Sequence, residues 1–261
     1  MKKLYLGTNT KMYKTIKDTC EYLERLKALT AEIPKAVELF VIPSYTSLSR
    51  AGEILQDSRI RLGAQNMCWE DEGQFTGEIS PRMIRETGAQ IIEIGHSERR
   101  HVFRETDEEE NRKVKTALRE GFTALLCIGE TGEEKEAGIS DEILRIQLKK
   151  GLSGISLNDS SRLWIAYEPV WAIGTKGIPA SPAYVADRHR AIRETLCGLF
   201  GCAEGQEIPI LYGGSVNQEN ACGFLQLENV DGLFIGRSAW EANSFSQIIQ
   251  MACRASGLLN E

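Results

Sequence analysis

The sequence contains no apolar run long enough to span a membrane, so we expect no membrane partner. Its first residues, from Met1 to Gly7, turn polar too soon for a signal peptide. Its cysteines are odd in number, seven in all, and show no closely spaced pair. This pattern fits free thiols in a reducing compartment. We therefore expect a cytoplasmic protein.

The sequence also lacks an excess of basic residues. It has 31 lysines and arginines against 37 acidic residues, a formal net charge of −6, which argues against nucleic acid as the main partner. An anionic substrate would instead need a local positive site. Hydrophobic residues make up 42% of the 261 residues, enough for a large core, and no stretch resembles a linker. We expect one domain over residues 1–261.

Short apolar strands alternate with longer amphipathic helices along the whole chain. The helices include one over 16–29 and one continuous helix over about 133–150. The sequence predicts strands at 4–7, 38–42, 60–64, 91–95, 123–128, 163–167, 208–212 and 232–235. These strands are apolar on both faces, as a sheet covered by helices requires.

This alternation predicts an α/β fold, a closed (β/α)8 barrel with eight parallel strands. Each strand–helix unit averages about 30 residues, the size of one parallel βαβ step, and eight such units fill the roughly 250 residues of a barrel. The alternative is a doubly wound open sheet. That fold needs a glycine-rich turn after the first strand, and residues 7–11, Gly-Thr-Asn-Thr-Lys, do not form one.

The stretch that begins at Glu168 places a carboxylate where the sixth strand stops. Pro169 keeps Glu168 out of the helical region. An apolar flap over 170–173 follows, with Gly174 and Gly177 as pivots. Closing such a flap would remove water and raise the basicity of the carboxylate. The alternative is an ordinary loop whose Trp171 packs on the core.

The predicted strand ends carry other groups suited to chemistry, and in a barrel these ends meet at one face. Together they offer a base, an imidazole, a cation and two glycine-rich loops whose backbone N–H groups suit a phosphate. Each alone has a plainer explanation as a core histidine, a solvated lysine or a tight turn. The residues are Asn9, Lys11, His96, Glu98, Glu168, Gly213–Ser215 and Gly236–Ser238.

Several of these stretches resemble the triosephosphate isomerase family. The specific matches are Gly95–Arg100 (GHSERR), Ala166–Thr175 (AYEPVWAIGT) and Tyr212–Val216 (YGGSV). Together with weaker matches, these stretches run from residue 9 to about residue 240 in the order and spacing of the family. The resemblance implies isomerisation of a small phosphorylated sugar with no metal and no organic cofactor.

The resemblance also implies residue roles, some of which are established for triosephosphate isomerase itself. In that enzyme a glutamate, here Glu168, is the base, and a neutral histidine, here His96, polarises the carbonyl. Lys11 would supply positive charge, Asn9 would bind the oxyanion and Glu98 would hold Lys11. Gly174, Gly214, Ser215 and Gly236 would bind phosphate, with Ser97 and Cys127 in support. The loop over 74–78 resembles the dimer loop of the family and implies a homodimer.

The sequence departs from the family near the substrate. Thr10 and Tyr13 replace the usual tryptophan and asparagine. Counted from Glu168, Pro179 falls where a backbone N–H normally bonds the tyrosine of the YGGS loop, so we expect Tyr212 to lack that partner. Arg237 replaces a glycine of the phosphate loop and places a guanidinium at or near the pocket, or else in solvent.

These departures resemble the branch of the family proposed to act on L-erythrulose 1-phosphate, so triose and tetrulose phosphates both fit. Two other classes remain. A non-catalytic sugar-phosphate sensor would be expected to lose Glu168 or His96, and both are present. An aldolase would need a Schiff-base lysine or a metal cluster at a late strand end, and none is found there.

Overall fold

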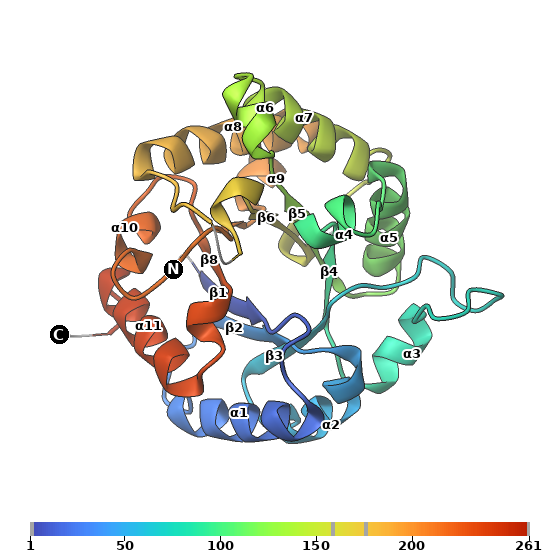
Figure 1. Ribbon diagram of the computed structural model, residues 1–261, viewed down its shortest axis with the longest axis vertical. Coiled ribbons are helices and arrows are strands. Elements are labelled where there is room, and N and C mark those ends of the chain that lie inside the picture. The colour runs from blue at the N-terminus through green and yellow to red at the C-terminus, as the bar shows by residue number, and fades with distance from the viewer. Residues whose placement is uncertain (1–2, 158–159, 175–176, 260–261) are drawn as a thin grey trace.

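The computed structural model describes residues 3–157, 160–174 and 177–259. Its parallel strands form a closed barrel in which each pairs with the next along the chain and β8 returns to β1. This confirms the barrel and rules out the open sheet (Figure 1). The strands are β1 (Leu4–Asn9), β2 (Val37–Ile42), β3 (Ile60–Ala64), β4 (Ile91–Ile94), β5 (Thr123–Ile128), β6 (Leu163–Tyr167), β7 (Ile210–Tyr212) and β8 (Gly232–Ile235).

A ring of helices surrounds the barrel, as Figure 1 shows. The helices are α1 (Ile16–Leu29), α2 (Tyr45–Leu55), α3 (Pro81–Glu86), α4 (Ser97–His101), α5 (Asp107–Arg119), α6 (Gly132–Glu136), α7 (Ser140–Gly151), α8 (Pro182–Phe200), α9 (Cys202–Glu207), α10 (Ala221–Leu225) and α11 (Ala242–Ala255). Single 3₁₀ turns η1 (Ser160–Arg162), η2 (Val170–Ala172) and η3 (Arg237–Ala239) precede or follow strands.

Some predicted boundaries are wrong. The continuous helix expected over 133–150 is two helices, α6 and α7, because Gly138 between them adopts a left-handed φ of +74°. The strand expected over 208–212 begins only at Ile210, since Pro209 has no N–H with which to extend the ladder. The first strand runs past residue 7 to Asn9, which pairs with Ile42 and so reaches the barrel mouth.

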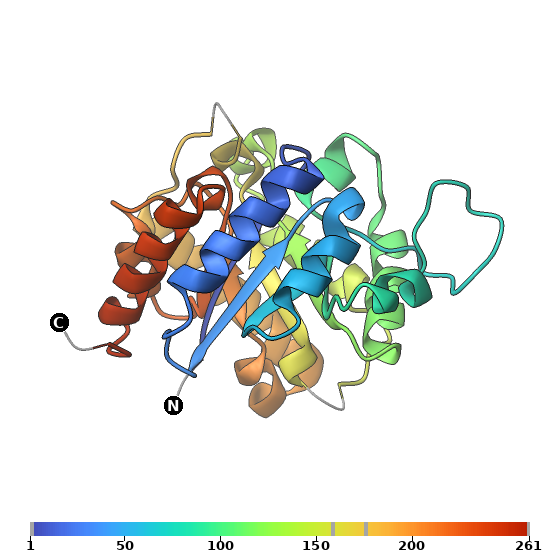
Figure 2. The ribbon, with the colours of Figure 1, turned by 90° about the horizontal axis from the view of Figure 1, so that it is seen from below.

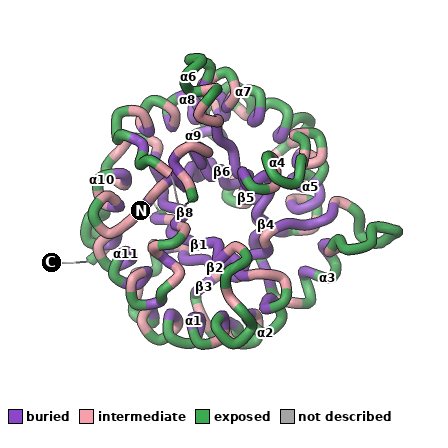
Figure 3. The backbone as a smooth tube through the Cα atoms, in the orientation of Figure 1, coloured by how far each residue is buried: buried purple, intermediate pink, exposed green. Residues whose placement is uncertain are grey.

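The strands are largely buried (Figure 3), and they separate two apolar layers. In β5, Leu126 and Ile128 pack outward against the helices, whereas Leu125 and Cys127 point into the barrel. This alternation follows from the two-residue period of a strand. The inner layer is Phe40, Ile42, Ile91, Leu125, Cys127, Trp164, Ala166, Leu211 and Phe234.

The segment between β3 and α3 projects from the barrel wall in both ribbon views (Figures 1 and 2). It contains the predicted dimer loop, and its Phe75 is 41% exposed. Among the described residues no helix has the length and apolar character that crossing a membrane requires.

Candidate active site

A cleft of about 400 Å³ opens at the carboxyl ends of the strands. It brings together side chains or backbone from β1, β4, β6, β7 and β8, which lie far apart in the sequence. Ten of the predicted site residues line it: Asn9, Lys11, His96, Glu98, Glu168, Gly174, Gly214, Ser215, Gly236 and Arg237. Ser97 and Cys127 are buried beside it.

Glu168 follows β6 and is 4% exposed. Burial raises its pKa to about 7, although the charge of Lys11 opposes the shift. Its Oε2 has no full hydrogen bond among the described residues, while the Ser97 amide and the Cys127 thiol lie near enough to lower the pKa in part. A Cβ on Gly213 would lie 2.7 Å from Cγ of Glu168, so glycine is needed there. The carboxyl is therefore a poorly solvated base.

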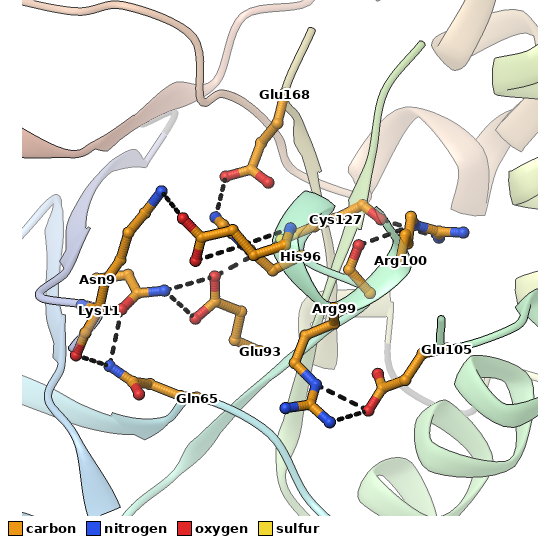
Figure 4. Close-up of polar contacts among 12 residues, drawn as sticks. Asn9, Lys11, Gln65, Glu93, His96, Arg99, Arg100, Glu105, Cys127 and Glu168 are labelled. Atoms are coloured by element: carbon orange, nitrogen blue, oxygen red, sulfur yellow. Dashed lines mark hydrogen bonds and ion pairs between the residues drawn. The ribbon is translucent and has the colours of Figure 1, made fainter. Parts of the chain in front are cut away.

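His96 caps the short helix α4, and Nδ1 of its ring accepts a hydrogen bond from the Glu98 backbone N–H at 3.2 Å. With Nδ1 as acceptor, the proton of the neutral ring lies on Nε2, which is 3.6 Å from Oε1 of Glu168. Burial and then the charges of Lys11 and Arg99 lower the pKa of His96 to about 3. The imidazole, whose contact with Glu168 is drawn in Figure 4, is therefore neutral at pH 7, as expected.

Lys11 and Asn9 lie at the end of β1. Lys11 has a left-handed φ of 51°, a strained backbone for a non-glycine residue. Its Nζ pairs with Oε1 of Glu98 at 2.9 Å, as the resemblance implied. Asn9 Oδ1 accepts from the Lys11 backbone N–H at 2.6 Å and from Gln65 Nε2 at 3.0 Å. These bonds fix the orientation of the Asn9 amide and hold the lysine at the cleft.

Three turns that contain glycine also line the cleft. Gly213–Ser215 follows β7, Gly236 follows β8 and Gly174 ends the apolar flap with a φ of +84°. Such turns can direct backbone N–H groups at an anion. The predicted phosphate residues therefore line the same cleft as Lys11 and His96.

The flap is anchored on a buried glutamate, Glu130. The sequence alone did not reveal that Glu130 is a shared hydrogen-bond acceptor. Its carboxylate accepts hydrogen bonds from Trp171 Nε1 at 2.8 Å, Tyr184 Oη at 2.9 Å and Tyr167 Oη at 3.1 Å. Trp171 therefore packs on the body of the barrel while Ala172–Gly174 border the cleft. Thr175 and Lys176 of the predicted lid lie outside the described residues.

Comparison with known proteins gives the family. The family model described as triosephosphate isomerase matches residues 4–252. This chain belongs to the triosephosphate isomerase family. It is 42% identical over 247 residues to L-erythrulose-1-phosphate isomerase of Rhizobium etli, covering 94% of this chain and 91% of the relative. It is 41% identical over 250 residues to triosephosphate isomerase of Fusobacterium nucleatum, covering 96% of this chain and 99% of the relative.

A third relative extends the match to nearly the full length of both chains. L-erythrulose-1-phosphate isomerase of Rhizobium meliloti is 41% identical over 255 residues, which is 97% of this chain and 98% of the relative. Relatives with two different substrates in their names thus have similar identities to this member of the family.

The departures from the family pattern border the cleft. Arg237 lines the cleft and is exposed, with no ion pair or side-chain hydrogen bond to any described residue. Tyr13 lines it too and stacks on Trp240, with ring centroids 4.5 Å apart. Trp240 Nε1 donates to the Asn9 backbone carbonyl at 2.9 Å. This aromatic pair covers the strand that carries Asn9.

The prediction that Tyr212 lacks its backbone hydrogen bond agrees with the structure, in which the Tyr212 hydroxyl has no full hydrogen bond to any described residue. Burial raises the pKa of the Tyr212 phenol, and an interaction with the backbone N–H of Ala180 lowers it in part. The contact falls short of full hydrogen-bond geometry. The interacting N–H belongs to Ala180, the residue after Pro179, which has no N–H of its own.

Sequence reasoning also missed Glu93, which points into the barrel from β4 and is fully buried. One oxygen of Glu93, one of Glu168 and a ring nitrogen of His96 lie within 4.8 Å of one another, and among the described residues only this group has spacing suited to a metal ion. The positive charge of Lys11 lowers the pKa of all three groups, and the same charge disfavours a cation there. We assign the group to acid–base chemistry.

Proposed function

We propose that this protein interconverts an aldose and a ketose phosphate by moving one proton between adjacent carbons. Membership of the family supports the reaction class. The observation that carries the proposal is the pairing of a buried Glu168, with a pKa raised to about 7, and a neutral His96, across 3.6 Å. A base with a pKa near the working pH and a neutral hydrogen-bond donor are what proton abstraction beside a carbonyl needs.

In the proposed reaction Glu168 removes the proton from the carbon next to the carbonyl. His96 donates its Nε2–H to the carbonyl oxygen, and the negative charge of the resulting enediolate is stabilised by Lys11 and the Asn9 amide. Glu168 then returns the proton to the neighbouring carbon while His96 moves protons between the two oxygens. Protons balance within the substrate, so no redox cofactor and no metal enter the proposal.

We assign phosphate binding to the turns that contain glycine. Gly174, Gly214, Ser215 and Gly236 would offer backbone N–H groups, and Lys11, which lines the same cleft, would add positive charge. On a protein with a net charge of −6, such a local site is what would attract an anionic substrate.

Two substrates remain candidates. The family description points to glyceraldehyde 3-phosphate and dihydroxyacetone phosphate. L-erythrulose 1-phosphate is supported by Arg237, whose guanidinium lines the cleft without an ion pair to any described residue and could reach the end of a four-carbon chain, and by the names of the Rhizobium relatives. We favour the four-carbon ketose phosphate for that reason. With the triose as substrate, the enzyme would serve glycolysis and gluconeogenesis.

The remaining assignments are proposals from family membership. We propose a cytoplasmic homodimer, each subunit one domain over residues 1–261. The projecting loop with Phe75 and the 93% exposed Met12 beside Lys11 offer apolar surface for the second subunit. A non-catalytic sensor would have no use for the paired Glu168 and His96.

A steady-state comparison tests the function. Purified enzyme is assayed with glyceraldehyde 3-phosphate, dihydroxyacetone phosphate and L-erythrulose 1-phosphate, and kcat/KM is compared. Turnover of one or more supports an isomerase, and the largest kcat/KM identifies the substrate. Binding of all three with no turnover would instead support the sensor.

A further inference from the structure

Glu93 is an unusual residue for the inner layer of a barrel. It shares the inward face of β4 with Ile91, while Ile92 and Ile94 pack outward. Its side chain is 0% exposed, and no described lysine or arginine forms an ion pair with it. A buried ionisable group without a cation at contact distance costs stability, so it commonly has a function.

The hydrogen bonds of Glu93 lead to the active site through Asn9. Asn9 Nδ2 lies 2.7 Å from Oε2 and 3.0 Å from Oε1 of Glu93 (Figure 4). The Asn9 amide cannot be turned round, because its Oδ1 already accepts from the Lys11 N–H and from Gln65. Glu93 is therefore the acceptor that holds the Asn9 amino group beneath the cleft.

The charges around Glu93 are also unusual. Its carboxyl lies with Glu168 and His96 in the group whose ligand atoms fall within 4.8 Å of one another. Two buried carboxylates this close repel each other, so one of them keeps its proton. Glu93 is the deeper of the two, and its pKa is raised well above the ordinary value by burial and then by Glu168. Glu168, with a pKa near 7, ionises first.

The groups facing Glu93 come from three other strands and from α4. Lys11 lowers its pKa, while Glu168 and Glu98 raise it. The Cys127 thiol lies 3.9 Å from its Oε1. His96 is neutral and adds no charge.

We propose that Glu93 is a positioning residue for the isomerisation. It holds the Asn9 amide in place, and it stays protonated, so that Glu168 is the ionised carboxylate of the pair. The inference rests on the proposed function. As a neutral acid, Glu93 offers Asn9 an acceptor without placing a second negative charge beneath the enediolate. Asn9 in turn keeps an N–H for the developing oxyanion.

Three variants test the proposal by turnover. Glu93→Leu leaves the Asn9 Nδ2 without its acceptor, and we expect kcat to fall roughly 10- to 100-fold, the worth of an unpaired buried donor, with little change in KM. Glu93→Gln restores an acceptor without a charge, so it should recover most of that loss. Ile91→Val, on the same inward face, is the matched control for a change in barrel packing.

The pH profile separates positioning from packing. In the wild-type enzyme, ionisation of Glu93 at alkaline pH should reduce kcat, and Glu93→Gln should lose that alkaline limb. A packing role would leave the limb where it is. The proposal is overturned if Glu93→Leu and Ile91→Val have the same kcat, or if the limb is unchanged in Glu93→Gln.

A measurement independent of turnover completes the test. Carbon-13 NMR of glutamate-labelled enzyme, compared with Glu93→Gln, should show that the Glu93 carboxyl is protonated at pH 7. An ionised Glu93 at pH 7 would overturn the proposal. If the wild-type enzyme turns over no sugar phosphate, the proposed function fails, and the NMR result still decides the protonation of Glu93.

Discussion

The two mouths of the barrel differ in how their charged groups are satisfied. The cleft at the amino ends of the strands has a volume of about 460 Å³, and the one at the carboxyl ends has about 400 Å³. At the amino-end mouth, Arg61 donates to Thr123 Oγ1 at 2.8 Å and to Gln90 at 3.1 Å, and its guanidinium lies 5.0 Å from the Trp164 ring. Lys3 pairs with Glu38 there at 2.7 Å.

At the carboxyl-end mouth two charged groups are left incompletely satisfied. Within the part of the chain that the structure describes, Glu168 Oε2 has no full hydrogen bond and Arg237 has no ion pair, and the backbone of Lys11 is strained. Cavity volume therefore does not distinguish the two mouths, whereas unsatisfied and strained groups do. Strain and unpaired charge persist where function needs them and the surrounding fold supplies the stability.

Removing the base should have the largest effect. Glu168→Gln keeps the shape but cannot take a proton, so we expect kcat to fall roughly 10²- to 10⁴-fold with sugar-phosphate binding largely intact. Glu38→Gln, at the amino-end mouth, is the matched control and should leave kcat unchanged. Steady-state assays of the pure variants check both, and near-normal turnover in Glu168→Gln would refute its role as the base.

The sequence predicted the fold and the composition of the site because both depend on local rules. Apolar strands with intervening helices determine a barrel, and the ends of its strands carry Asn9, His96 and Glu168. Glu93 was missed because the strand over 91–95 was treated as apolar on both faces. The alternation of β4 would have placed Glu93 inside the barrel, above Ile91.

Sequence reasoning failed where the structure depends on contacts between segments that are distant in the chain. Ala180 influences the Tyr212 phenol from a different loop, so counting residues from Glu168 could not reveal that interaction. Glu130 gathers Tyr167, Trp171 and Tyr184 from three elements, and no local pattern marks such an acceptor. Loop length and buried hydrogen-bond networks are tertiary properties.

A comparison of two arginines sharpens the contrast between the mouths. Arg237→Gly should lower kcat/KM for L-erythrulose 1-phosphate by roughly 10- to 100-fold, the worth of a charged hydrogen bond. We expect a smaller decrease in kcat/KM for the triose phosphate. Arg61→Met should instead lower thermal stability and spare kcat/KM, because Arg61 is bonded within the fold. Equal losses for both substrates in Arg237→Gly would show that Arg237 does not select the substrate.

The pH dependence of turnover tests the unsatisfied carboxyl directly. Glu168 must be ionised to act as a base, and its pKa is raised to about 7, so kcat/KM should rise with pH up to about 7 and fall about tenfold per unit below it. A substrate phosphate also titrates, near pH 6. Unphosphorylated glyceraldehyde is therefore the control substrate. If kcat/KM for glyceraldehyde fell only near pH 4.5, the ordinary pKa of a glutamate, this result would contradict the burial of Glu168.

The smallest effect is expected from Tyr212, which faces the Ala180 amide at the end of the flap. If flap closure completes this contact, Tyr212→Phe removes one hydrogen bond, worth about 0.5–1.5 kcal/mol, so kcat/KM should fall roughly 2- to 10-fold. Tyr5→Phe is the matched control at the amino-end mouth, at the other end of the barrel from the flap. If Tyr212→Phe matched Tyr5→Phe in every kinetic constant, the Ala180 contact would have no part in closure, and Arg237 and the glycine-rich turns would have to hold the substrate without it.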